Sequence, residues 1–155
     1  MKQSPTQFEQ QIERLTGILS DQLQLHQTLL QLMQEKRIAI READLDRIEA
    51  ICEREQELTH NLGELEKQRL TLVGELTEAL DPKAQKPMTV SQIVRHCEPE
   101  NGEELSRISD ALREAIANVS KQSAILRQAA DALAQHMSGI AHTIQNVLSR
   151  AVVYG

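Results

Sequence analysis

Aromatic residues are almost absent from this 155-residue chain, which has one Phe, one Tyr and no Trp. Compact cores and ligand pockets usually draw on aromatic side chains for buried area. Glycine and proline are also scarce, at six and four residues, which leaves room for few turns. With abundant Leu, Ile, Ala, Gln and Glu, these absences predict an all-α protein of long helices packed by aliphatic layers, and they argue against an enzyme.

Further absences narrow the class of protein. The net charge of −6 provides no general cationic surface, so we expect no nucleic-acid ligand. Two cysteines, Cys52 and Cys97, do not make a disulfide framework and favour a reduced, cytoplasmic setting. The N-terminal residues contain no apolar signal-peptide core, and no stretch approaches about 18 continuous apolar residues, so we expect no stable membrane insertion.

Apolar residues recur at steps of three and four along three long segments, a spacing typical of helices that pack along other helices. The other faces of the first segment are rich in glutamine, Gln22 included, and are expected to be polar. Glu55 and Arg69 interrupt the apolar row of the second segment. The row of the first segment is nearly unbroken: Phe8, Ile12, Leu15, Leu19, Leu23, His26, Leu30 and Met33.

Turn and capping signals separate the segments. Asp44 can cap the second helix and Thr89 a short one, and prolines lie at positions 82, 87 and 99. We therefore expect a single helical domain over residues 1–155, an elongated antiparallel helical bundle or coiled coil of about three long helices and one short helix. The expected helices span residues 5–40, 44–80, 88–97 and 102–153.

The last segment carries little charge. Residues 115–155 contain only Lys121, Arg127, Asp131 and Arg150 as formally charged side chains. A helix surrounded by solvent would ordinarily carry more. This helix is therefore either sandwiched between the other two or covered by a partner. About 50 residues span roughly 75 Å, and past residue 135, where the helix can outrun its neighbours, the partner interpretation gains weight.

Candidate catalytic chemistry is thin. Glu57 and His60 form one Glu-x-x-His pair, whereas di-iron bundles need two such pairs. His26 and His136 fall in apolar rows, where we expect each to be a packing residue with a satisfied nitrogen. A lowered thiol pKa for Cys97 beside His96 is only weakly indicated. We expect no catalytic residue, no metal site and no cofactor.

The order of segments over essentially the whole chain resembles the FlgN family of flagellar export chaperones. A Leu- and Gln-rich helix is followed by Glu35-Lys36-Arg37, a turn at Ala43-Asp44, a charged helix with Glu-Lys-Gln-Arg-Leu at residues 66–70, and a Pro-rich break. A long low-charge helix then closes on Tyr154-Gly155. The resemblance implies a cytosolic helical protein that escorts hook–filament junction proteins to the flagellar type III export apparatus. It further implies that the C-terminal helix binds the terminal helical segment of the cargo, and that a tyrosine near its end, here Tyr154, takes part in docking at the export gate.

The apolar side chains of the last helix are the expected contacts with such a cargo helix, since a helix can lay its apolar stripe along another. The alternative is that the same residues form the bundle core, or the seam of a homodimer in a structural coiled coil or oligomerisation module without chaperone activity. A helical-bundle enzyme or metal carrier is the third hypothesis. The predicted partner-binding residues are Leu126, Leu133, Met137, Ile140, Ile144, Val147, Leu148 and Tyr154.

Overall fold

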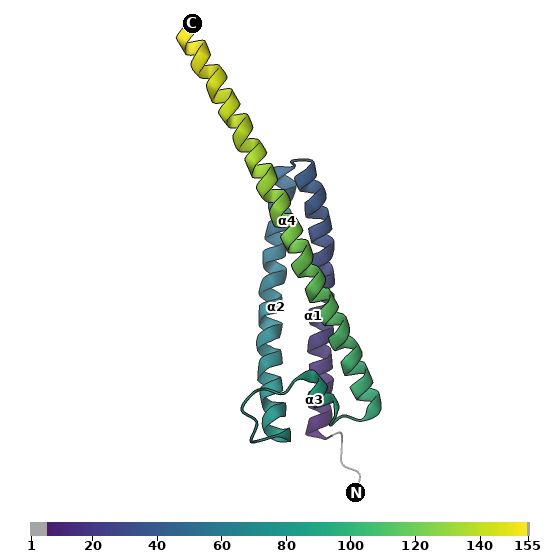
Figure 1. The fold of residues 1–155 in the computed structure, drawn as a ribbon. Helices are drawn as coiled ribbons and strands as arrows, with labels where there is room; N and C mark the ends of the chain where they lie inside the picture. Colours follow the sequence, from purple (N-terminus) through teal and green to yellow (C-terminus); the bar gives the residue numbers. More distant parts are fainter. Residues whose placement is uncertain (1–5, 155) are drawn as a thin grey trace.

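The computed structural model describes the backbone of residues 6–154 and the side chains of residues 6–150. The helices are α1 (Gln7–Arg41), α2 (Leu45–Leu80), α3 (Val90–Val94) and α4 (Pro99–Tyr154) (Figure 1). The described residues contain no β-strand. The predicted all-α bundle of three long helices and one short helix is therefore confirmed. That residues 1–155 form one domain stays a prediction.

The three long helices alternate in direction (Figure 1). Helices α1 and α2 form an antiparallel hairpin, and α4 then runs in the same direction as α1. The backbone of α1 lies close to both α2 and α4, so α1 is the central helix. Near the base, the core joins Leu15 of α1, Leu76 of α2, Ile93 of α3 and Leu105 of α4, all of them almost fully buried.

A second core cluster lies toward the closed end of the hairpin. It joins Leu29 and Met33 of α1, Leu58 of α2 and Leu126 of α4. The two clusters are aliphatic, and Phe8 is partly buried against the first. The scarcity of aromatic residues thus corresponds to layers of Leu, Ile, Val and Met between helices.

Local signals fix the ends of the helices. Helix α1 closes in a Schellman motif, in which the backbone N–H of Asp44 donates to Ala39 O at 2.9 Å and that of Ala43 donates to Ile40 O at 3.1 Å. The Asp44 carboxylate then accepts from the Arg47 backbone N–H at 3.2 Å and caps α2, as predicted. Thr89, also as predicted, caps α3 and forms a capping box with Gln92.

Two helices, α3 and α4, differ most from their predicted ranges. Helix α4 begins at Pro99 and not at residue 102, because proline is tolerated in a first turn where its missing N–H has no helical partner. Helix α3 covers Val90–Val94 only, in place of residues 88–97. It packs against the first turns of α4, where Gly102 permits the close approach: a Cβ at this position would lie 3.2 Å from Cγ1 of Val94.

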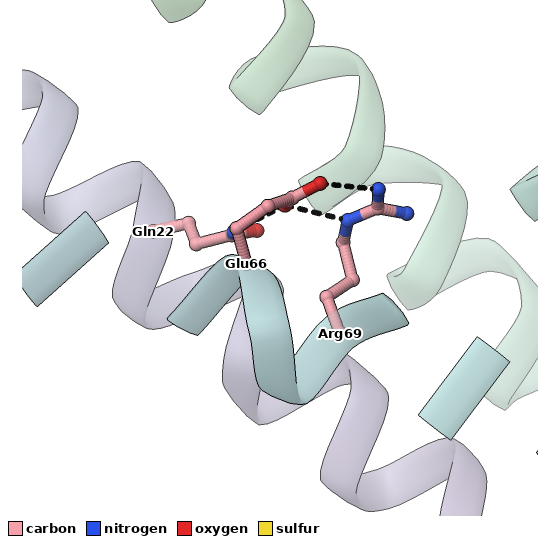
Figure 2. Close-up of polar contacts among 3 residues, drawn as sticks. All are labelled: Gln22, Glu66 and Arg69. Atoms are coloured by element: carbon pink, nitrogen blue, oxygen red, sulfur yellow. Dashed lines mark hydrogen bonds and ion pairs between the residues drawn. The ribbon is translucent and has the colours of Figure 1, made fainter. Parts of the chain in front are cut away.

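One level of the bundle is polar (Figure 2). Gln22 of α1, expected on a polar outer face, is in fact only 6% exposed. Its Nε2 donates to Oε2 of Glu66 at 3.0 Å, and Arg69 donates from both Nε and Nη2 to the same carboxylate. The hydrogen bonds from Arg69 hold the pKa of Glu66 below its usual range. Arg69 thus interrupts the apolar row of α2 because it balances a carboxylate that also binds α1.

His26 lies one turn after Gln22 and is half-buried. Its Nδ1 is buried without a hydrogen-bond partner among the described residues, so the satisfied nitrogen expected of His26 is not this one. The reason is that Gln22, Glu66 and Arg69 at this level bond to one another. Burial lowers the pKa of His26, since the charged imidazolium is disfavoured away from water.

Ala43 is a non-glycine residue with a positive φ, at 52°, so its backbone conformation is strained. The left-handed region costs an L-residue with a Cβ roughly 1–2 kcal/mol, whereas glycine adopts it freely. Ala43→Gly is therefore expected to raise the free energy of unfolding by roughly 0.5–1 kcal/mol after the entropy cost of glycine. The control, Ala50→Gly at an exposed position inside α2, is expected to lower it by about 1 kcal/mol. Urea denaturation measures both, and a loss of stability in Ala43→Gly would contradict this account of the turn.

The burial of His26 predicts how the free energy of unfolding depends on pH. Its folded-state pKa is lowered, so the unfolded chain, with an ordinary pKa of about 6.5, binds a proton that the folded chain excludes. Stability is therefore expected to fall as the pH drops from 7 through about 6.5. His26→Leu should flatten this slope but keep the further loss of stability below about pH 4.3. There Glu66 takes up a proton in the unfolded chain, whereas its lowered pKa keeps it ionised in the folded chain. Unfolding free energies measured across this pH range test the point, and parallel profiles for the two proteins would refute it.

Candidate partner-binding surface

Helix α4 extends beyond the closed end of the α1–α2 hairpin (Figure 1). At about 1.5 Å per residue its 56 residues span roughly 84 Å, against roughly 52 Å for the 35 residues of α1. Leu133 is the last α4 residue packed against the core, and residues 134–150, which we call the tail, are all exposed. The tail is about 25 Å long, and nothing in the described part of the chain covers it.

Five large apolar side chains form one stripe along the tail. At about 100° per residue they fall within an arc of about 100°, on the face by which Leu112, Leu126 and Leu133 pack against the bundle. The packing seam of α4 thus continues past the point where its neighbours end. We call these residues the tail stripe, and their exposed fractions are 43% for Met137, 47% for Ile140, 54% for Ile144, and 60% for both Val147 and Leu148.

The tail is almost free of formal charge. Arg150 is its only Lys, Arg, Asp or Glu, and the face opposite the stripe carries neutral polar residues such as Gln135 and Asn146. A partner helix lying on the stripe would therefore displace water from apolar groups without stripping hydration from charges. The arrangement is suited to binding an apolar helix face.

The predicted partner-binding residues divide into two groups. The five of the tail stripe are exposed and lie on one face. Leu126 is only 5% exposed and belongs to the core, and Leu133 is packed against it, so these two side chains hold α4 on the bundle. The side chain of Tyr154 lies outside the described residues. The role of each residue toward a partner stays a prediction.

His136 does not have the packing role that was expected of it. Its side chain is exposed, because α4 has already left the bundle at this position. Cys97 likewise has no activated thiol: its Sγ donates to Ile93 O at 3.4 Å, and burial raises the pKa of the thiol. Among the residues that the structure describes, no three His, Cys, Asp or Glu side chains are grouped as a metal site would require.

Sequence reasoning missed a groove of about 570 Å³ on the bundle itself. It lies between α2 and α4, with α1 as its floor, and it contains the polar level of Gln22, His26, Glu66 and Arg69. Ile116, which is 47% exposed, forms part of the α4 wall. The one signal in the sequence was that Ile116 stands outside the 3-4 row of its helix.

Comparison with known proteins assigns the chain to a family. No described helix carries an apolar stretch long enough to cross a bilayer. No curated protein and no solved structure matches the chain. The family model described as FlgN protein matches residues 1–155, the whole chain. The chain therefore belongs to the FlgN family, the family of flagellar export chaperones that its sequence resembles.

Proposed function

We propose that this protein is a cytoplasmic flagellar export chaperone that binds the terminal amphipathic helices of hook–filament junction proteins along its tail stripe and delivers them to the type III export apparatus. The observation that carries the proposal is the tail stripe, a packing seam that continues from the core without a partner in the described chain. Membership of the FlgN family supports the export role.

The mechanism is physical masking. Helices that assemble outside the cell present apolar stripes, and inside it such stripes would pair prematurely or aggregate. The tail stripe can cover one of them as a helix-on-helix contact. Met137 suits this role because its flexible thioether side chain adapts to partners of different shape.

The size of the tail stripe limits what it can do alone. Completing the burial of five half-exposed side chains contributes roughly 5 kcal/mol. Association itself costs about 4–15 kcal/mol in lost freedom of motion. A stable complex therefore needs contacts beyond the stripe, and the neutral flanks of the tail, Gln145 and His136 among them, are the nearest groups to supply them. We propose that the binding surface continues toward Tyr154. The family resemblance implies that this tyrosine takes part in docking at the export gate.

A charge placed within the stripe is the sharpest test. Ile144→Glu would bury an unpaired carboxylate against the cargo helix, and a residue at the centre of such an interface contributes about 2 kcal/mol or more. Binding of a hook–filament junction protein, measured by isothermal titration calorimetry, is therefore expected to weaken by about 30-fold or more.

The matched control is Asn146→Glu, which adds the same charge on the opposite face of the tail and is expected to bind within about threefold of the unmodified chain. Circular dichroism verifies that both variants keep their helix content. Equal binding by Ile144→Glu and the unmodified chain would contradict the site. A chain cut after Ala134 is expected to lose cargo binding, and retained binding would move the site to the bundle. A full chain that self-associates but binds no hook–filament junction protein would favour a structural coiled-coil module.

A further inference from the structure

We propose that the groove between α2 and α4 receives the tail stripe of a second copy of this chain, so that two chains without cargo cover each other's tails. The groove is an unassigned surface, and the proposal goes beyond the binding of cargo. The two surfaces match in shape, hydrogen bonding, charge and length.

The groove exists because α1 approaches both of its neighbours closely, while α2 and α4 approach each other less. Leu62 of α2 and Leu112 and Ile116 of α4 provide apolar walls. Ile116 is 47% exposed although it stands beside the core. Burial of such a half-exposed side chain on a concave surface contributes strongly to binding when an apolar side chain of another helix packs against it.

Two buried polar atoms in the residues that form the floor lack partners. Nε2 of Gln22 donates to Glu66, so the amide is oriented with Oε1 as an acceptor, and Oε1 has no donor among the described residues. Nδ1 of His26, one turn further along α1, is also without a partner. A buried polar group without a hydrogen bond is costly. A helix seated in the groove with a side-chain amide at its flank would supply the missing donor after a small rotation of the Gln22 side chain.

The tail has the chemistry that the groove requires. Its stripe is apolar, and Gln145 beside the stripe carries an N–H₂ donor. Glu66 and Arg69 already neutralise each other in the groove, and the exposed Arg113, which also lines it, pairs with Asp110 at 3.9 Å, so a neutral occupant leaves no charge unpaired. The tail, whose only formal charge is Arg150, meets this condition.

The lengths also agree. The α2 wall from Thr59 to Arg69 rises about 15 Å, and the stripe from Met137 to Leu148 rises about 17 Å. A chain cannot place its own tail there, because α4 is one continuous helix that carries the tail away from the groove (Figure 1). The tail that fills the groove must therefore come from a second copy.

One consequence rests on the proposed function. A tail stripe seated in the groove of another chain cannot hold cargo at the same time, so self-association and cargo binding compete. The paired form would keep the apolar stripe out of water until cargo arrives.

Sedimentation velocity over a range of concentrations tests the pairing without cargo. The unmodified chain is expected to form dimers. Ile116→Glu in the groove and Ile144→Glu in the tail are each expected to weaken the dimer by about 30-fold or more. Ile38→Glu, a control at a side chain that is 43% exposed on α1, should leave it unchanged. A chain that stays monomeric at all concentrations would overturn the proposal, as would a dimer that Ile116→Glu does not weaken.

Cargo binding is then measured separately on the same variants. Ile116→Glu should weaken the dimer while binding cargo at least as tightly as the unmodified chain, because less of the tail is occupied by a second copy. A failure of the groove and a failure of the proposed function therefore give different results. Cross-linking gives the direct evidence. In chains with Cys52→Ala and Cys97→Ala, Thr59→Cys mixed with Ile144→Cys and a short bis-maleimide should give a cross-linked pair. If Ile144→Cys chains cross-link only with one another, and no cross-link to a Thr59→Cys chain forms, then the tails pair with each other. That result would refute the proposal that the groove receives the tail.

Discussion

The packing of α1 between α2 and α4 is the contact on which the other features depend. Helix α1 is the floor of both core clusters, and its length sets how far the bundle extends. Where α1 ends at Arg41, the Schellman motif and the Asp44 cap turn the chain back, and α4 loses its cover. The exposed stripe therefore results from a difference in length between helices that share one apolar pattern.

The tail is a helix for a different reason from the rest of α4. Starting a helix is unfavourable, but the tail extends a helix already held by Leu105, Leu112 and Leu126, so each added residue needs only propagation. Its Ala and Gln residues and Leu148 propagate a helix well, whereas Gly139 and the β-branched residues propagate it less well. Without tertiary contacts, however, its backbone hydrogen bonds open at a lower cost than those of the packed part of α4. This combination gives a surface that is shaped for a helical partner and still able to adjust to it.

Much of the fold could be read from the sequence because its causes are local. Asp44 and Thr89 cap helices through side chains three residues from their targets, and the 3-4 rows identify the core faces. The residue of α4 at which the bundle ends could not be predicted from the sequence. It depends on which residue of α4 lies beside Arg41 of α1, and this is decided by packing between segments that are distant in the sequence. For this reason Leu126 and the tail stripe looked alike in sequence, although one is core and the other is exposed.

The polar level was hidden for a similar reason. Gln22 stands among many glutamines of α1, and its burial follows only from its meeting with Glu66 and Arg69, more than forty residues away. Arg69 was visible as an interruption of an apolar row, but its partner was not. Ile116 beside this level stands outside the 3-4 row of its helix, but that position alone does not indicate a groove, which forms only where three helices come together.

Hydrogen exchange of the backbone amides in residues 134–150, measured with and without a bound hook–filament junction protein, tests directly whether the tail binds cargo. We expect fast exchange in the free, dilute chain and strong protection of this segment in the complex. The buried stretch from Ile12 to Met33 should be slow to exchange in both. A complex that forms while the exchange of residues 134–150 stays fast would contradict the assignment of the tail as the binding surface.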